Sequence, residues 1–411
     1  MKTAKGAEDE TKQETLTKDH IKKTIEKEFL LHCFDKINTP IIELEETLTQ
    51  KYAGGNEILK EIYTLQDQGK RKLALRYDLT VPLARHIAQN PTIKLPFKRF
   101  QIGSVFRDGP IKQGRKRQFT QIDADIIGEP SYKAEIELLS AASNALKKLN
   151  IKHVIKINDR QILNETLKKC NIQKTQEFIL TLDKLEKIGE QGVKKELHQK
   201  GYDPTNTQKA LDILSKPLEQ ITKEIGEAAT KNLKETLTEL KKNKANIEFS
   251  PTLARGLSYY TGLIYEGFSI ETDFTSSILG GGRYDNMLKE YTGKDFPSAG
   301  ISFGLEPLYQ IMKNYEASKE NIIIHIKQEK KAKEIMNILR DLEIPTEISP
   351  KSNIKKSMSY ANAKNKVSAI IIGEDEVKNN TYTLRNLETG NEQKIKLKQI
   401  KENPSIILNK F

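Results

Sequence analysis

The chain of 411 residues is long enough for two or three domains and for a sizeable buried core. Apolar residues make up 36% and charged residues 30%, and no apolar run reaches the roughly 18 residues of a membrane helix, so we expect no segment to span a membrane. The net charge of +12 is compatible with a polyanionic partner. Its excess lysines are spread over helical faces, however, so charge alone does not choose between DNA and RNA.

The N-terminus and the cysteines both favour a cytoplasmic protein. The first residues lack the apolar core of a secretory signal. The two cysteines, Cys33 and Cys170, lie far apart in the sequence, and no further cysteine or histidine completes a zinc-ligand spacing. We therefore expect reduced thiols and no metal held by protein ligands alone.

The first half of the chain changes from helix to sheet. Residues 1–17 are polar, and we expect them to be loose. The spacing of Ile21, Ile25 and Phe29 predicts a helix, and a strand-like segment follows at 37–43. Short alternating runs separated by Gly, Asp and Pro between about 62 and 128 predict an antiparallel sheet.

The second half predicts an insertion and a separate domain. Residues 131–148 read as a helix, and about 160–245 as a helical block rich in Lys, Glu and Leu that Pro217 kinks or divides. Strand-like, Gly-rich sequence returns at 253–304, so the block is most simply an insertion. From about 320, apolar strands at 321–326 and 367–372 alternate with helical segments, which predicts a small α/β domain.

Two strand-like segments, 97–107 and 118–128, present polar side chains at alternate positions. Arg99, Gln101 and Arg107 share one face of the first, and Gln121, Asp123 and Asp125 share one face of the second. Arg107 and the loop residue Arg115 can each bind a phosphate with two hydrogen bonds, while Gln121 and Asp125 suit an uncharged or cationic ligand. On alternation alone, an exposed hairpin with a basic turn explains the pattern at least as well.

Three further segments carry side chains suited to a ligand. They are Leu75-Arg-Tyr-Asp-Leu-Thr80, Arg255-Gly-Leu-Ser-Tyr-Tyr-Thr-Gly262 and Gly280-Gly-Gly-Arg-Tyr-Asp285. A cation beside two tyrosine hydroxyls can hold a phosphate-bearing ligand together with a small polar one. Each segment also has a plain structural interpretation, because Asp78 and Thr80 can cap a turn and glycine triplets usually form turns.

Together these segments resemble the histidyl-tRNA synthetases, a family of class II aminoacyl-tRNA synthetases. The resemblance covers nearly the whole chain. It includes a first motif around Pro40, a second motif from Phe106-Arg107 to Arg115 and Phe119, and a third motif at 297–307. The Leu-Arg-Tyr-Asp wording is closest to the archaeal, eukaryotic and related bacterial types. Two positions depart from the family pattern: Gly109 replaces an acid and Pro307 replaces an arginine.

The resemblance implies an α+β fold: an antiparallel catalytic sheet with flanking helices in residues 1–318, a helical insertion at about 160–245, and an α/β anticodon-binding domain in residues 319–411. It implies activation of L-histidine with ATP and Mg²⁺, transfer to tRNA(His), a cytoplasmic homodimer, and no DNA or membrane partner. The insertion would contact tRNA, and no editing domain is expected, since a site that hydrogen-bonds imidazole discriminates without one.

The resemblance also assigns residues. Arg255 and Arg107 would be catalytic, and Arg107, Arg115, Arg255 and Gly304 would bind ATP. Histidine would be held by a larger set: Asp78, Leu79, Thr80, Gln121, Asp125, Tyr259 and Tyr260. The alternative is an inactive paralogue similar to the regulatory subunit of ATP phosphoribosyltransferase. Such paralogues usually lack the C-terminal domain and much of the signature wording, and this chain has both.

Overall fold

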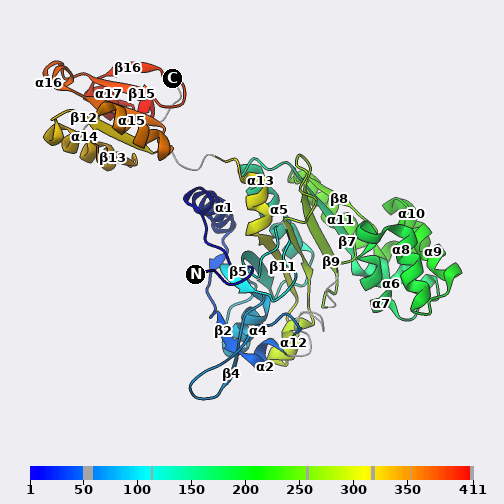
Figure 1. Cartoon of the computed structure of the whole chain (residues 1–411). Helices are drawn as coiled ribbons and strands as arrows, with labels where there is room; N and C mark the ends of the chain where they lie inside the picture. The colour runs from blue at the N-terminus through cyan, green and yellow to red at the C-terminus, as the bar shows by residue number, and fades with distance from the viewer. Residues whose placement is uncertain (50–58, 113, 256–258, 316–319, 352, 408–411) are drawn as a thin grey trace. The chain divides into compact units, whose positions relative to one another are not determined.

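The computed structural model describes residues 1–49, 59–112, 114–255, 259–315, 320–351 and 353–407 (Figure 1). The chain divides into two compact units, Met1–Tyr315 and Glu316–Phe411. Among the described residues, no helix is both long and apolar enough to cross a membrane.

An eight-stranded sheet organises the first unit. Its order is β1 (Asp35–Lys36), β5 (Phe97–Phe106), β6 (Gln118–Ile127), β11 (Ser298–Gly304), β10 (Leu279–Arg283), β9 (Leu263–Ser269), β7 (His153–Asp159) and β8 (Ile247–Phe249). Neighbouring strands are antiparallel except for the outer pairs β1–β5 and β7–β8. A separate three-stranded sheet has the order β2 (Ile42–Leu44), β4 (Lys72–Leu75) and β3 (Thr64–Gln66).

Three helices cover one face of the large sheet: α1 (Lys12–Leu31), α5 (Lys133–Lys148) and α13 (Leu305–Met312). Ile122 and Ala124 of β6 join their core, and the ring of Phe29 on α1 lies 5.7 Å from that of Phe100 on β5. Because side chains alternate along a strand, Gln121, Asp123 and Asp125 point to the opposite face. The predicted amphipathic hairpin thus buries its apolar side, and its polar side is free to build a site.

Smaller helices complete this part of the unit: α2 (Glu45–Leu48), α4 (Thr80–Gln89) and α12 (Met287–Thr292). The helix α4 lies inside the region that sequence alternation assigned to sheet. Its start is fixed by Asp78, whose carboxylate accepts a hydrogen bond from the backbone N–H of Val81 at 3.0 Å. Leu83, Ala84 and Ile87 bury one helical face, and the alternating strands on either side obscure this helical period in the sequence.

The helical block consists of α6 (Arg160–Lys169), α7 (Thr175–Leu182), α8 (Leu185–Gln199), α9 (Pro204–Leu214), α10 (Leu218–Ile225) and α11 (Lys231–Lys242), with the 3-10 turn η1 (Glu227–Ala229). Figure 1 shows α6–α10 gathered beside β7 and β8. Pro217 is the N-cap of α10, so it divides two helices. The chain leaves the sheet at β7 and returns at β8, and these two strands pair in parallel.

The N-terminal segment is more ordered than its polar sequence suggested. The helix α1 begins at Lys12, and Thr11 caps it by accepting a hydrogen bond from the N–H of Glu14. Gly6 is buried, and its carbonyl accepts hydrogen bonds from the N–H groups of Arg117 and Gln118 at 3.0 and 3.2 Å. These long-range contacts are absent from local sequence patterns.

The second unit has one mixed five-stranded sheet. Its order is β13 (Thr346–Ile348), β12 (Asn321–His325), β14 (Ser368–Ile372), β15 (Tyr382–Asn386) and β16 (Glu392–Ile395). The helices are α14 (Glu329–Asp341), α15 (Ile354–Ala363), α16 (Glu374–Asn379) and α17 (Leu397–Glu402), followed by the 3-10 turn η2 (Pro404–Ile407). The first strands are parallel and joined by helices, as their apolar runs indicated.

Candidate functional site

A cavity of about 540 Å³ lies against β6, β10 and β11, on the side of the sheet to which Gln121 and Asp125 point. This volume suits a small-molecule ligand. Its wall includes every candidate residue from the sequence except one: Asp78, Thr80, Arg107, Arg115, Gln121, Asp125, Arg255, Tyr259, Tyr260 and Gly304. The exception is Leu79, which is fully buried and offers its carbonyl to Arg99 at 3.4 Å.

Three carboxylates of the cavity wall interact with one another: Asp78, Asp123 and Asp125. Asp78 caps α4 and also lines the wall, so the capped turn and the ligand site are the same feature. Burial raises the pKa of Asp78 to about 6, although Arg107 and the N–H of Val81 favour its charged form. Burial also raises the pKa of Asp123 to about 7 and raises that of Asp125. Removal from water is therefore the main influence on all three groups.

A buried arginine beneath these carboxylates, Arg99, was not singled out from the sequence as a site residue. The Arg99 side chain is fully buried, and one guanidinium nitrogen lies 2.6 Å from a carboxylate oxygen of Asp125. The hydroxyl of Tyr284 donates to the other oxygen of Asp125. Arg99 and Asp125 are direct partners in the register of β5 and β6, so their shared polar face was the available signal.

The neighbouring polar groups leave one acceptor unused. The hydroxyl of Ser302 donates to Asp123 at 2.5 Å, and the amide nitrogen of Gln121 donates to that hydroxyl at 2.9 Å. The side-chain oxygen of Gln121 is buried and has no hydrogen-bond partner in the structure. Since an unpaired buried acceptor is costly, this oxygen suits a ligand that donates a hydrogen bond.

Guanidinium groups of Arg107, Arg115 and Arg255 also line the cavity. Nε of Arg107 donates to the carbonyl of Tyr77 at 2.9 Å, and its guanidinium carbon lies 5.2 Å from the centre of the Phe119 ring. Arg115 is 44% exposed and lies 3.3 Å from the carboxylate of Glu61. Neither arginine is fully engaged by an acid, so each retains donors for an anionic ligand.

Arg255 has an unusual backbone conformation, and its side chain packs closely against β10. Its φ of +49° is in the left-handed region that non-glycine residues rarely adopt. The Gly256–Ser258 part of its motif lies outside the described residues. One guanidinium nitrogen pairs with Glu266 at 3.1 Å. A Cβ at Gly280 would lie 2.1 Å from that same nitrogen, so only glycine at this position lets the side chain rest against β10.

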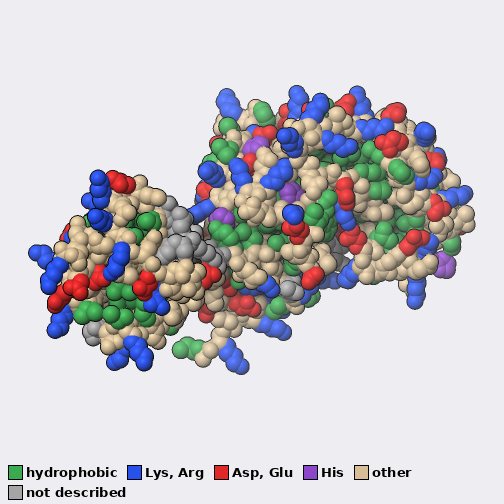
Figure 2. Space-filling view, turned by 90° about the horizontal axis from the view of Figure 1, so that it is seen from above, with side chains coloured by type: hydrophobic (Ala, Val, Ile, Leu, Met, Phe, Trp, Pro, Cys, Tyr) green, Lys and Arg blue, Asp and Glu red, His purple; other side chains and the backbone are tan. Residues whose placement is uncertain are grey.

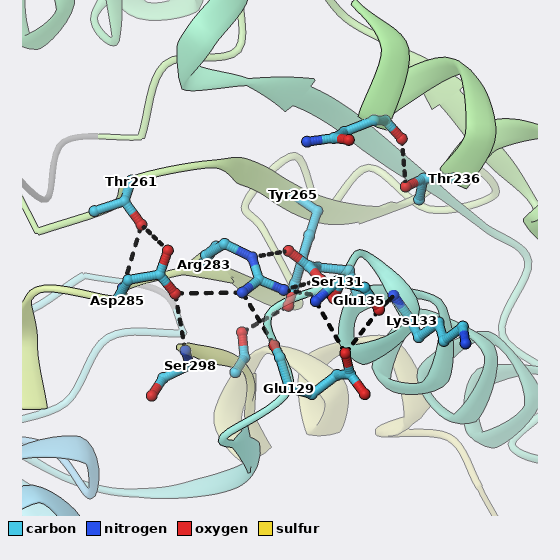
Figure 3. A network of polar contacts seen from close by, with 12 residues as sticks. Glu129, Ser131, Lys133, Glu135, Thr236, Thr261, Tyr265, Arg283, Asp285 and Ser298 are labelled. Atoms are coloured by element: carbon cyan, nitrogen blue, oxygen red, sulfur yellow. Dashed lines mark hydrogen bonds and ion pairs between the residues drawn. The ribbon is translucent and has the colours of Figure 1, made fainter. Parts of the chain in front are cut away.

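A network around Arg283 fixes the tyrosine pair beside Arg255. Figure 3 shows the Arg283 guanidinium between Glu135 and Asp285, at 2.7 and 3.3 Å. Asp285 accepts from the hydroxyl of Thr261 at 3.2 Å and from the N–H of Ser298 at 2.9 Å. Thr261 directly follows Tyr259 and Tyr260, whose ring centres are 4.7 Å apart. The network therefore holds both tyrosines at the cavity wall.

The two departures from the family pattern have local consequences. Asp108 pairs with Arg117 at 2.8 Å, whereas a Cβ at Gly109 would lie 2.6 Å from a carboxylate oxygen of Glu61. The acid that faces Arg115 is thus Glu61, which the sequence did not reveal. Pro307 lines the cavity without offering a cation, and Glu306 pairs with the buried Lys18 at 2.8 Å.

Two family models match the chain. A model described as histidyl-tRNA synthetase matches residues 6–308, and one described as an anticodon binding domain matches residues 321–403. The first covers most of the unit that contains the cavity, and the second covers most of the smaller unit.

Individual relatives agree with these matches. The chain is 41% identical over 424 residues to histidine–tRNA ligase 1 of Bacillus cereus, covering 98% of this chain and 97% of that one. It is similar to the crystal structure of histidyl-tRNA synthetase from Nostoc sp. PCC 7120, with 26% identity, 98% of each chain covered and a TM-score of 0.85.

A further solved structure is described as an ATP phosphoribosyltransferase regulatory subunit/histidyl-tRNA synthetase from Bacillus halodurans C. It covers 90% of this chain and 98% of its own, with a TM-score of 0.74 and 20% identity, so this likeness concerns the fold alone. The predicted α+β architecture with a C-terminal anticodon-binding domain is confirmed. The relatives named here are bacterial, which gives no support to the expected archaeal or eukaryotic type.

Proposed function

This chain belongs to the histidyl-tRNA synthetase family, and from that membership we propose how its cavity performs the work of a histidine–tRNA ligase. The family activity is ATP-dependent formation of histidyl-adenylate followed by transfer of the histidyl group to tRNA. The observation that carries the proposal is that one cavity is lined both by carboxylates, Asp78, Asp123 and Asp125, and by guanidinium groups, Arg107, Arg115 and Arg255. Histidine is a cation at its amino group and ATP is a polyanion, so the two sets of charges suit the two substrates.

The carboxylates of the cavity wall bind histidine. Asp78 is the counter-ion for the ammonium group, with Thr80 as a neutral partner and Leu79 as the buried support of the turn. Gln121 and Asp125 meet the imidazole N–H groups, because both present acceptor oxygens. Tyr259 and Tyr260 close the site beside them. Arg99 supports Asp125 from behind, since its guanidinium lies 2.6 Å from that carboxylate and opposes the rise in its pKa that burial causes.

The guanidinium groups of the cavity wall bind ATP and stabilise charge in the transition state. Arg107 and Arg115 hold phosphate oxygens, Arg255 lies where the α-phosphate and the attacking carboxylate meet, and Gly304 lets the nucleotide approach the backbone. The carboxylate of histidine attacks the α-phosphorus, and pyrophosphate leaves. Positioning and electrostatics supply the rate, since the protein forms no covalent bond with the substrate.

Mg²⁺ is proposed as the companion of ATP. Within the described ranges, no cluster of three acidic, histidine or cysteine side chains could hold a metal ion. Mg²⁺ commonly binds through substrate phosphates with one or two carboxylates, so the phosphates of ATP would supply most of its ligands. When bound, the ion would neutralise phosphate charge.

Contacts with tRNA are assigned to both units. Residues 319–411 are proposed to read the anticodon, in line with the domain model that matches them. The insertion at about 160–245 is proposed to contact tRNA, as the resemblance implies. Figure 2 shows Lys and Arg side chains scattered over the face in view with Asp and Glu between them, so phosphate contacts would be distributed. The proposed compartment is the cytoplasm, where translation uses charged tRNA.

A homodimer is also proposed. Four apolar side chains of the small sheet and the loop before it are each at least 42% exposed: Ile41, Ile42, Leu44 and Leu65. A cluster of exposed apolar side chains marks an interaction surface more often than scattered ones do. It follows Pro40, the centre of the motif that forms part of the dimer interface in the family.

The deciding experiment is histidine-dependent exchange of pyrophosphate into ATP, without tRNA. Wild-type protein should exchange with histidine and with no other standard amino acid. Asp125→Asn should lose most of this exchange, whereas Asp212→Asn should keep it, because Asp212 is exposed on α9 in the insertion and contacts Gln208. Absence of exchange in the wild type would instead favour an inactive paralogue, for which the Bacillus halodurans structure offers a likeness of fold.

A further inference from the structure

The backbone that presents Arg255 is strained and needs external support. A non-glycine residue with φ of +49° persists only where surrounding contacts hold it. The segment just before it, Pro251–Ala254, belongs to no helix or strand. Its carbonyl groups must therefore find partners elsewhere, and those partners decide where Arg255 lies.

Two buried side chains bind these carbonyls. The amide nitrogen of Asn158, at the end of β7, donates to the carbonyls of Pro251 and Leu253, both at 2.9 Å. The guanidinium of Arg160, the first residue of α6, donates to the carbonyl of Ala254 at 3.2 Å. Arg160 is only 3% exposed, so this contact is shielded from water.

The other contacts come from the helical insertion. A second nitrogen of Arg160 donates to the side-chain oxygen of Gln176 on α7 at 2.9 Å. Asp183, the C-cap of α7, lies beside Arg255: burial raises the pKa of its carboxyl, and the charge and the backbone N–H of Arg255 both oppose that rise. Asp183 also lines a hollow of about 50 Å³ together with Ala254 and Glu266, and Glu266 is the ion-pair partner of Arg255.

We propose that Gln176 and Asp183 of the insertion, with Arg160 between them and Ala254, are positioning residues that hold Arg255 in its reactive place. Arg160, Gln176 and Asp183 are not among the residues that line the cavity, so they act through Arg255 and not on a substrate. The inference rests on the role of Arg255 proposed above.

The consequence is that the first chemical step depends on the insertion, even without tRNA. A displaced Arg255 would stabilise the transition state less while leaving the histidine and phosphate contacts in place. The structure therefore predicts a loss in kcat with little change in KM. Simple destabilisation of the insertion would instead lower the amount of folded protein.

The test measures exchange of pyrophosphate into ATP with purified full-length variants whose folding is checked by thermal unfolding. Asp183→Ala and Gln176→Ala should each lower kcat by about tenfold, with KM for histidine and ATP within about twofold. Asp183→Asn keeps an oxygen acceptor for the Arg255 N–H, so it should stay within about threefold of wild type. Gln176 and Asp183 are both exposed, so neither substitution opens a cavity in the apolar core.

The matched control is Asp203→Ala. Asp203 caps α9 in the same insertion by accepting from the N–H of Asn206 at 2.8 Å, and it has no contact with the 251–255 segment. Its loss should weaken the insertion by the usual amount for a helix cap and leave kcat within about twofold. A second control is Asp183→Ala combined with Arg255→Ala, which should be no slower than Arg255→Ala alone because both act through one group.

The outcomes are distinguishable. A wild-type protein without histidine-dependent exchange would overturn the proposed function. With an active wild type, the positioning role is overturned if Asp183→Ala and Gln176→Ala keep kcat within twofold, or if Asp203→Ala slows exchange equally. Equal losses in Asp183→Asn and Asp183→Ala would overturn the hydrogen-bond role of Asp183. Additive losses in the double variant would show that Asp183 does not act through Arg255.

Discussion

Removing the Arg255 side chain is the sharpest test of the assigned chemistry. Loss of one preorganised donor that acts in the transition state costs about 3–4 kcal/mol. Since about 1.4 kcal/mol is a factor of ten, Arg255→Ala should lower kcat for exchange by about 10²–10³. The fold should survive, because the arginine lies on the cavity wall and not in the apolar core.

The structure adds a second effect to this substitution. Arg255 and Glu266 are 3.1 Å apart, and their side chains are only 19% and 24% exposed. Arg255→Ala therefore leaves an unpaired carboxylate on the wall of a phosphate site. At an effective dielectric constant of about 20, two like charges about 6 Å apart repel by roughly 3 kcal/mol before screening by salt. This repulsion should appear as a raised KM for ATP.

Two comparison variants separate these effects. Arg255→Ala combined with Glu266→Gln should recover the KM for ATP while kcat stays low, because the anion is removed and the cation is still missing. Arg71→Ala removes one cation from an exposed pair with Asp67, outside the cavity, and should exchange like the wild type. Exchange by Arg255→Ala within tenfold of wild type would refute the assigned role.

Three further predictions test other parts of the site. Because the pKa of Asp78 is raised to about 6, its carboxylate becomes protonated as the pH falls below 6. The KM for a triazole analogue of histidine, whose ring stays neutral in this range, should then rise about tenfold per pH unit. A KM that does not change with pH would contradict the counter-ion role of Asp78. Gly6→Ala should slow exchange, since the φ of Gly6 is +83° and a Cβ there would lie 2.7 Å from Cγ of Arg117. Gly201→Ala is the control, because its φ of +85° is similar but the added Cβ would meet open space, and it should not slow exchange. Equal rates for the two variants would show that the N-terminal segment does not support the loop that carries Arg115 and Arg117. A chain ending at Tyr315 should keep histidine-dependent exchange and lose its preference for the histidine anticodon; unchanged relative charging of anticodon-swapped tRNA would exclude anticodon reading by the C-terminal unit.

Local patterns were sufficient for much of the fold. The alternation in 118–127 predicted a strand with an apolar and a polar face, and the structure buries Ile122 and Ala124 beneath helices. Pro217 marked a division between helices for the same local reason. The helix α4 was missed because its ten residues lie between strands and its start depends on one cap, Asp78.

The parts that the sequence left open depend on partners distant in the chain. Glu61 faces Arg115 across 54 positions, and Lys18 meets Glu306 across 288. Neither pair follows a local period, so periodicity could not connect them. Arg99 was placed on the correct face of its strand, but its pairing with Asp125 required the register of β5 and β6. The roles of the individual site residues stay predictions until the variants are measured.

The buried charges explain why the carboxylates of the site depend on the neighbouring arginines. Asp78, Asp123 and Asp125 all have raised pKa values because burial removes them from water. Left alone, such carboxyls would become neutral and would no longer bind an ammonium group strongly. Arg99 lowers the pKa of both Asp123 and Asp125, and Arg107 does the same for Asp78, so these arginines oppose the effect of burial and favour the charged forms.

Arg107 therefore has two tasks. From the cavity wall it stabilises the Asp78 carboxylate that meets histidine, and it offers its remaining donors to the nucleotide phosphates. A phosphate that takes up the donors of Arg107 leaves the Asp78 carboxylate available to an ammonium group, and an ammonium group bound to Asp78 leaves Arg107 available to phosphate. The energetic result is that histidine and ATP should each bind better in the presence of the other, which brings the reacting carboxylate and phosphorus together in one complex.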